Sequence, residues 1–210
     1  PANSIAFLKG GPIMISDDSF DTMWAGLKAK YGFDDKQIRK YAGSPAPFIV
    51  DKRAVQQGYV TSEPMVIEHQ GGFKPKLFLL ADNGYLTYGS LVLAKRRWIE
   101  SKPDVVRAFV EASAEGWRDY LDGDPKPGDA LIKKGNPDMS DAILADARAR
   151  MKAYGIVDSG DAKTLGIGAM TDARWSDFFK LVVSEGLYPA DLDYRKAYTL
   201  QFVGKGGAAH

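Results

Sequence analysis

From residue 13 to residue 80, short apolar runs alternate with segments whose apolar residues have helical spacing. The runs predict strands at 13–15, 38–41, 59–61 and 76–80, and the segments between them predict helices. The order β-α-β-α-β-α-β is typical of a mostly parallel sheet with helices on its faces. We therefore expect an α/β fold.

The clearest predicted helix follows the first apolar run. Ser16-Asp17-Asp18-Ser19 opens it, and Gly32 is a typical stop signal. Its apolar residues recur at helical spacing: Phe20, Met23, Trp24, Leu27 and Tyr31. Because Trp24 lies within this apolar stripe, we expect its ring to be part of the core.

The rhythm changes at Ala81-Asp82-Asn83-Gly84-Tyr85. One more strand is predicted at 86–95, and the rest of the chain is mainly helical. The predicted helices start near Ser101, Ala130, Ser140 and Thr171, and 198–203 is predicted to be extended. This change indicates a boundary near residues 81–85.

The composition excludes several classes of site and partner. The 210 residues, 45% of them apolar, are enough for one large domain or two small lobes. The 28 basic and 27 acidic residues nearly cancel, so no basic field indicates nucleic-acid binding. The absence of cysteine excludes disulfides, thiolate metal sites and cysteine nucleophiles. With only His69 and His210, we expect neither a histidine metal site nor a serine–histidine triad.

The predicted strand at 59–61 ends in Thr61-Ser62-Glu63. Ligands of open α/β sheets bind outside the carboxyl ends of strands, and a carboxylate there can accept hydrogen bonds from an amine or amidine edge. Thr61 and Glu63 are therefore candidate binding residues. The alternative is a helix start, with Thr61 or Ser62 as N-cap and with Glu63 and Pro64 in the first turn.

Several segments together carry a resemblance to a known family. They are Leu8-Lys9-Gly10-Gly11-Pro12-Ile13, 22–33, Gln56-Gln57-Gly58-Tyr59-Val60-Thr61-Ser62-Glu63-Pro64, Lys102-Pro103-Asp104-Val105-Val106-Arg107-Ala108-Phe109, Gly168-Ala169-Met170-Thr171 and Tyr198-Thr199-Leu200-Gln201-Phe202. In their order and spacing, the chain resembles the substrate-binding proteins of bacterial ABC importers in the nitrate, sulfonate, taurine and thiamine-pyrimidine-precursor group. The resemblance covers almost the whole chain.

The resemblance implies a type II periplasmic-binding-protein fold, in which two α/β lobes are joined by a crossover hinge and ligand binds between them. It implies a second lobe at 10–80, a crossover at 81–88, and the remainder of the first lobe with a C-terminal helical layer at 89–203. We expect 204–210 to be a flexible tail. Family members carry a further N-terminal stretch, so we expect the first lobe to be incomplete in this chain unless a second chain completes it.

The resemblance also implies that the loop after the first strand faces the ligand, which adds Ser16, Asp17 and Ser19 as binding candidates. Free backbone N–H groups at such a helix start favour an anion, whereas the aspartates there repel one. The charge pattern therefore favours a ligand with amino or ring N–H donors. The alternative is simple helix capping by this loop. Tyr88, near the implied crossover, is a candidate for stacking on a flat ring.

The function implied by the resemblance is the extracytoplasmic solute-binding component of an ABC importer. We expect a small polar, nitrogen-containing or aromatic ligand, a permease in the membrane as partner, and a periplasmic or extracellular, membrane-attached location. We expect no catalytic residues, metal or cofactor. Two alternatives stay open: an enzyme of thiamine-pyrimidine biosynthesis on the same fold, which would need the cysteine-rich metal motif that this chain lacks, and a ligand-sensing domain.

Overall fold

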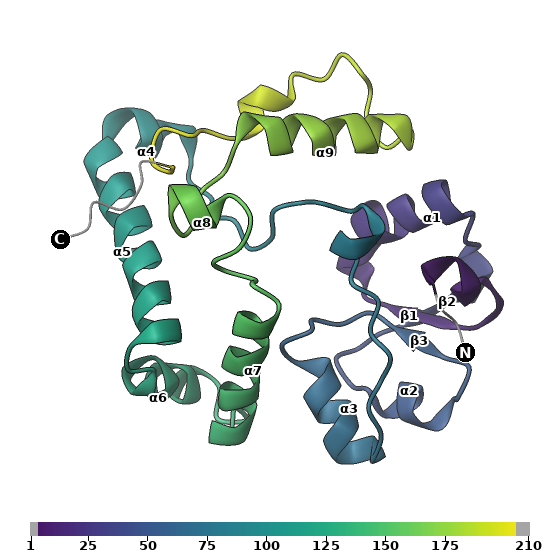
Figure 1. Ribbon diagram of the computed structural model, residues 1–210. Coiled ribbons are helices and arrows are strands. Elements are labelled where there is room, and N and C mark those ends of the chain that lie inside the picture. Colours follow the sequence, from purple (N-terminus) through teal and green to yellow (C-terminus); the bar gives the residue numbers. More distant parts are fainter. Residues whose placement is uncertain (1–3, 205–210) are drawn as a thin grey trace. The chain divides into compact units, whose positions relative to one another are not determined.

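The computed structural model describes residues 4–204. The chain divides into two compact units (Figure 1). Unit 1 comprises the residues up to Leu86 together with Asp177–Leu192, and unit 2 comprises Thr87–Ser176 and the residues from Asp193 onward. The division into lobes at 10–80, 81–88 and 89–203 stays a prediction. Most of the predicted tail at 204–210 lies outside the described residues.

Unit 1 contains a three-stranded parallel sheet in the order β2-β1-β3. The strands are β1 (Ile13–Ile15), β2 (Ile38–Lys40) and β3 (Val55–Gln56). In the register of the sheet, Ile13 lies opposite Ile38 on one side and opposite Val55 on the other. The expected parallel sheet is confirmed, and β1 is its central strand.

The two faces of β1 have different surroundings, because successive side chains of a strand point to opposite faces. Ile13 and Ile15 belong to the core cluster, with Trp24 and Phe33. The Trp24 ring is buried as predicted, and its Nε1–H donates to Asp35 Oδ1 over 2.7 Å. Met14 is also buried, on the other face of the strand.

Helices connect the strands of unit 1. After β1 the chain forms a 3-10 turn (Asp17–Ser19) and a π-helical turn (Phe20–Trp24), and it continues as α1 (Ala25–Tyr31). Gly32 ends this helix with φ 66°, a left-handed conformation that glycine adopts without steric cost. The remaining α-helices before the crossing into unit 2 are α2 (Ala46–Val50) and α3 (Glu63–Gly71).

Three predicted strands are wrong. The third strand of the sheet is Val55–Gln56 and not 59–61. Val55 N donates to Pro12 O, just before β1, over 2.8 Å, and Gln57 N donates to Met14 O of β1 over 2.9 Å. The apolar runs at 76–80 and 86–95 form no strand. Phe78 and Leu80 pack on the core without joining a ladder, and Leu93 is 90% exposed. The run at 76–80 is apolar because its side chains pack on the core. No strand in the described chain pairs with the run at 86–95.

Unit 2 is helical, as predicted. Its helices are α4 (Arg96–Ser101), α5 (Pro103–Asp122), α6 (Lys126–Gly135), α7 (Asp141–Ala153) and α8 (Ala162–Leu165). The last helix, α9 (Asp172–Ser184), begins in unit 2 and continues into unit 1 from Asp177. Ser140 caps α7 as predicted, since its Oγ accepts from Ile143 N over 3.2 Å.

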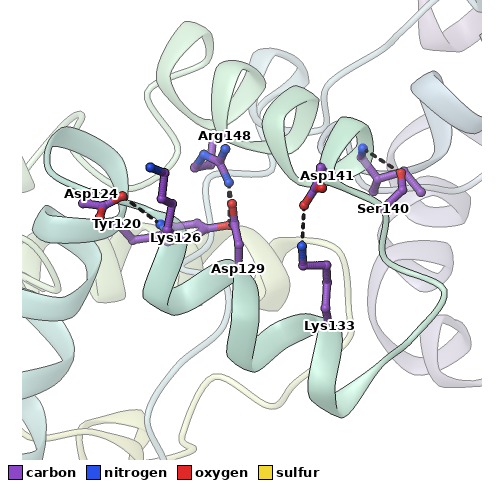
Figure 2. A network of polar contacts seen from close by, with 9 residues as sticks. Tyr120, Asp124, Lys126, Asp129, Lys133, Ser140, Asp141 and Arg148 are labelled. Atoms are coloured by element: carbon purple, nitrogen blue, oxygen red, sulfur yellow. Dashed lines mark hydrogen bonds and ion pairs between the residues drawn. The ribbon is translucent and has the colours of Figure 1, made fainter.

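A polar network joins α5, α6 and α7 (Figure 2). Arg148 Nη1 lies 2.6 Å from Asp129 Oδ1, and the Tyr120 hydroxyl donates to the same oxygen over 2.8 Å. The two charged side chains are only 18% and 14% exposed. A second ion pair, Lys133 with Asp141, links α6 to α7 over 2.5 Å. The network therefore fixes the three helices to one another through a charge-assisted contact.

Candidate functional site

The carboxyl edge of the sheet in unit 1 gathers the residues that follow the three strands. Ser16 follows β1, Tyr41 follows β2 and Gln57 follows β3. Because the strands are parallel, these three positions share one edge, where open α/β sheets bind their ligands. Tyr41 N donates to Ile15 O over 3.0 Å, which fixes the backbone at this edge.

Ser16 and Gln57 form a reciprocal pair of hydrogen bonds across the edge. Ser16 N donates to Gln57 Oε1 over 2.9 Å, and Gln57 Nε2 donates to Ser16 Oγ over 2.8 Å. Ser16 Oγ also lies 3.2 Å from Ser19 Oγ. Neither serine caps the following turn with its side chain. The capping alternative is therefore wrong for these side chains, which instead hold the first loop against the residue after β3.

The Glu63 carboxylate is fixed at this edge by two donors. The Tyr41 hydroxyl donates to Oε1 over 3.0 Å, and Tyr59 N donates to Oε2 over 2.7 Å. Burial, together with the hydrogen bond to Glu63, raises the pKa of Tyr41 to about 12, so the phenol remains a donor at neutral pH. Gly58 leaves room for this arrangement, because a Cβ there would lie 3.0 Å from Glu63 Cβ and 3.1 Å from its Cδ.

Thr61 and Glu63 do not follow a strand, contrary to the prediction. Ser62 N donates to Tyr59 O over 3.0 Å in a turn, and Glu63 is the first residue of α3. Pro64 lies in the first turn of α3, as the helix-start alternative predicts, but Ser62 at the N-cap position forms no side-chain capping bond. Thr61 is half-buried, and its side chain has no hydrogen bond within residues 4–204.

Asp17 lies beside the same edge but is exposed. Its Oδ2 pairs with Lys40 Nζ over 3.1 Å, and both side chains are more than 70% exposed. A pair this exposed contributes little to stability, on the order of 0–1 kcal/mol. Lys40 therefore compensates the charge of Asp17 without fixing its position strongly.

Tyr88 belongs to unit 2, and its hydroxyl is already used there. It donates to Asp161 Oδ2 over 2.8 Å and accepts from Thr171 N over 2.9 Å. The Arg174 guanidinium lies 4.4 Å from the ring centroid, and the Trp175 ring centroid lies 5.8 Å away. Burial raises the pKa of Tyr88. These contacts give Tyr88 a structural role within unit 2, and ligand stacking by its ring stays a prediction.

Two residues of this edge were missed as candidates. Tyr41 and Gln57 each come directly after a strand, and Gln57 precedes Gly58, a typical turn residue. That turn signal was available in the sequence. It identifies Gln57 only if the strand is placed at Val55–Gln56, and the prediction put it four residues later.

Taken together, Ser16, Ser19, Tyr41, Gln57 and Glu63 form what we call the carboxyl-edge cluster. Its acceptors are a carboxylate, an amide oxygen and hydroxyls, which suit a ligand with N–H donors. Within residues 4–204, no group of three or more His, Cys, Asp or Glu residues could hold a metal ion. Over the same residues, no helix is long and apolar enough to cross a membrane.

Comparisons with known proteins agree with a binding role. The family model described as NMT1/THI5-like matches residues 1–126, more than half of the chain. The chain is also 24% identical over 215 aligned positions to the riboflavin-binding protein RibY of Chloroflexus aurantiacus, and the match covers 98% of this chain and 60% of that protein. No solved structure matches. The family and the relative's name point to binding proteins rather than enzymes, and the resemblance seen in the sequence is confirmed: the chain belongs to the NMT1/THI5-like family.

Proposed function

We propose that the chain is the solute-binding component of an ABC importer and that its carboxyl-edge cluster binds a small, flat nitrogen heterocycle. Family membership supports solute binding. The observation that carries the proposal is the Glu63 carboxylate, which Tyr41 and Tyr59 N hold at the carboxyl edge of a parallel sheet.

The chemistry of Glu63 favours a ligand with N–H donors. An ionised carboxylate has about four acceptor sites. Tyr41 and Tyr59 N supply two neutral donors, and no cation pairs with Glu63 within residues 4–204. A half-buried charge that lacks a cationic partner gains most from further hydrogen bonds. Ring N–H or amino groups of a ligand would supply them.

The surroundings add a flat surface and a second polar anchor. Tyr59 is 77% exposed and follows Gly58, so its ring is free to lie against a planar ligand next to Glu63. The Gln57 amide offers both a donor and an acceptor at the same edge. A ring that carries both N–H and carbonyl groups matches this set. Since a relative of this chain is named as a riboflavin-binding protein, riboflavin is the first probe to use.

The charges of this edge disfavour anionic ligands. Glu63, Asp17 and Asp18 all lie on or beside it, and Lys40 is the cation paired there. Sulfonates and nitrate would be repelled by Glu63 and Asp18, with which no cation pairs among residues 4–204. We therefore place the ligand in the nitrogen-containing, aromatic class of the solutes that such importers carry.

The remaining parts of the proposal rest on the family. They are the two-lobed binding-protein fold, an extracytoplasmic, membrane-attached location, a membrane permease as partner, and a further polypeptide segment or chain that completes the first lobe. The chain spans about 60% of the length of the relative that it matches. The near balance of charge, with 28 basic and 27 acidic residues, supports a small-molecule ligand over nucleic acid.

The test is a ligand screen on this chain. Riboflavin binding is followed by quenching of its fluorescence, and riboflavin, an aminopyrimidine, taurine and nitrate are compared by thermal shift. We expect saturable binding and a raised melting temperature with a heterocycle, because a ligand that binds the native state stabilises it. Stabilisation by taurine or nitrate instead would contradict the assigned ligand class. Stabilisation by none of the four would contradict a binding role for this edge.

A matched pair of variants assigns the binding to Glu63. In Glu63→Gln one charged acceptor is lost, and we expect affinity to fall about tenfold, roughly 1.4 kcal/mol. Asp18→Asn removes another carboxylate of the same unit, an exposed one, and we expect affinity to change less than about twofold. Equal losses in the two variants would show a general charge effect rather than a contact with Glu63.

A further inference from the structure

Unit 1 has a hollow that is lined by residues other than those of the carboxyl-edge cluster. It lies on the Met14 face of the sheet, where β1, β2, α2 and the connection after α2 line a volume of about 380 Å³. Small-molecule sites typically have volumes of roughly 300–1,000 Å³. The hollow is therefore large enough for a small organic ligand.

The floor of the hollow combines an apolar and a cationic side chain. Met14 and Arg39 are paired in the register of β1 and β2, so their side chains project from the same face of the sheet. Met14 is only 6% exposed, and its thioether adapts readily to the shape of an apolar partner. Arg39 is exposed. An apolar surface and a guanidinium therefore lie next to each other in the hollow.

Arg39 is the lining cation that no carboxylate pairs with in the described part of the chain. Its Nη1 donates to Lys36 O and Ile38 O over 3.0 and 2.7 Å, which fixes the guanidinium near the start of its own strand. Both bonds use the same nitrogen. Nε and Nη2 remain for an anion, in the fork geometry that matches a carboxylate.

The other charged groups leave the hollow net positive. The lining of the hollow contains three cationic side chains, those of Arg39, Lys40 and Arg53, and one carboxylate, that of Asp51. Lys40 pairs with Asp17 over 3.1 Å, whereas Arg53 Nε lies 3.7 Å from Asp51 Oδ1 with its side chain 82% exposed. Exposed pairs such as these are weak and compete little with a ligand. The local charge therefore favours an anion.

The rim is apolar, which excludes a purely inorganic anion as the best ligand. Pro12, Pro47 and Val50 line the hollow, and Val50 is 81% exposed. Covering such side chains removes apolar surface from water, which favours binding. A ligand that fills the hollow gains from an apolar body as well as from a charged head.

We propose that this hollow binds a small organic anion with an apolar body, whose anionic head contacts Arg39 and whose body lies over Met14. The ligand class is opposite to that of the carboxyl-edge cluster, where the unpaired Glu63 carboxylate selects N–H donors. The proposal does not depend on the function assigned to that cluster.

The test follows the Met14 methyl group by NMR on the whole chain. With ¹³C-methyl methionine, the chain gives six methyl signals, and Met14→Leu identifies the one from Met14. Hexanoate is the probe, and acetate serves as a headgroup without an apolar body. We expect a saturable shift of the Met14 signal with hexanoate and an affinity for acetate that is lower by about tenfold or more.

Four variants assign the contacts. Arg39→Gln should weaken hexanoate binding by about tenfold, and Arg39→Lys, which keeps the charge but loses the fork, by less. Lys52→Gln removes a neighbouring exposed cation outside the lining and should leave the affinity unchanged, as should Glu63→Gln. A non-saturable shift would overturn the site. Equal losses in Arg39→Gln and Lys52→Gln, equal affinities for acetate and hexanoate, or a loss in Glu63→Gln would each overturn the assigned contacts.

Discussion

The carboxyl-edge cluster of unit 1 and the Tyr120–Asp129–Arg148 network of unit 2 are built from similar parts. In each, a tyrosine hydroxyl donates to a carboxylate of low exposure, over 3.0 Å at Glu63 and over 2.8 Å at Asp129. The two groups differ in the second partner of the carboxylate. Asp129 has the Arg148 guanidinium at 2.6 Å, whereas Glu63 has a neutral backbone N–H.

The charge of this second partner decides whether the carboxylate can still accept hydrogen bonds from a ligand. The charge of Asp129 is neutralised by the Arg148 guanidinium, and its bonds to Arg148 and Tyr120 hold α5, α6 and α7 together. A carboxylate held by neutral donors keeps its charge and part of its acceptor capacity, so it can still bind a ligand donor. The difference therefore indicates a structural role for the network in unit 2, and it supports the recognition role that we propose for the cluster in unit 1.

The largest effect on stability is expected from Arg148→Met. The substitution leaves the Asp129 carboxylate, 14% exposed, without its cation, and we expect a loss of about 2–3 kcal/mol in the free energy of unfolding. Urea denaturation followed by circular dichroism measures it. The double variant Arg148→Met/Asp129→Leu should recover part of the loss, because no unpaired charge remains. A loss below about 0.5 kcal/mol would show that the network is not a structural clamp.

Glu63→Gln should have the opposite profile, with a large effect on ligand affinity and a smaller one on stability. We expect the free energy of unfolding to fall by about 1 kcal/mol, since two hydrogen bonds to a charged acceptor become bonds to a neutral one or are lost. Tyr41→Phe is the matched control, because it removes one donor and keeps the carboxylate. If affinity in Glu63→Gln holds while stability falls, Glu63 is only a first-turn residue of α3.

Gly58→Ala tests whether the position of Glu63 matters. The new Cβ would meet Glu63 Cβ at 3.0 Å and Cδ at 3.1 Å, so the side chain must move by a few tenths of an ångström. We expect ligand affinity to fall by about threefold, roughly 0.7 kcal/mol. Gly10→Ala, where a Cβ meets nothing within 4 Å, serves as the control in the same titration. Unchanged affinity in both variants would mean that the carboxylate tolerates displacement.

Glu185, in unit 1, differs from both Glu63 and Asp129 because one of its carboxylate oxygens receives no hydrogen bond among the described residues. Oε2 is buried with no hydrogen-bond partner among the described residues, and burial raises the pKa of Glu185, partly offset by the nearby Lys30. Because the folded-state pKa is raised, the folded state binds this proton more tightly than the unfolded state does. Its contribution to stability is therefore full below the ordinary glutamate pKa of about 4.3, and it falls as the pH rises through the raised value.

Glu185→Gln should remove this dependence. We expect a slightly higher melting temperature than that of the unmodified chain at pH 7, and a difference that shrinks as the pH is lowered toward 4. Thermal melts at a series of pH values measure it. A melting temperature that falls at pH 7 would show that the charged form of Glu185 has a stabilising partner.

Local patterns were enough to predict the elements that depend on local signals. The helical spacing from Phe20 to Tyr31, the stop at Gly32 and the Ser140 cap are all present, as are the first two strands. The third strand was misplaced because it is only two residues long. It is defined by pairing with β1 some forty residues away, which the sequence pattern near Tyr59 does not report.

The same limit explains the candidate site. Glu63 was singled out as a residue at a strand end, yet it arrives at the edge as the first residue of α3. Tyr41 and Gln57 were missed because their roles depend on which strand lies beside which. Residue chemistry therefore identified the carboxylate, whereas its donors could be found only after the sheet was assembled.

Recognition of a ligand N–H by Glu63 is tested by a titration cycle that removes the ligand's donor and the protein's acceptor separately. Riboflavin and its N3-methyl derivative, which lacks the ring N–H, are titrated against the unmodified chain and against Glu63→Gln, with fluorescence quenching as the readout. We expect methylation to weaken binding by about tenfold in the unmodified chain and by less than about threefold in the variant. Equal effects of methylation in the two proteins, or no saturable binding of riboflavin, would show that Glu63 does not bind the ring N–H.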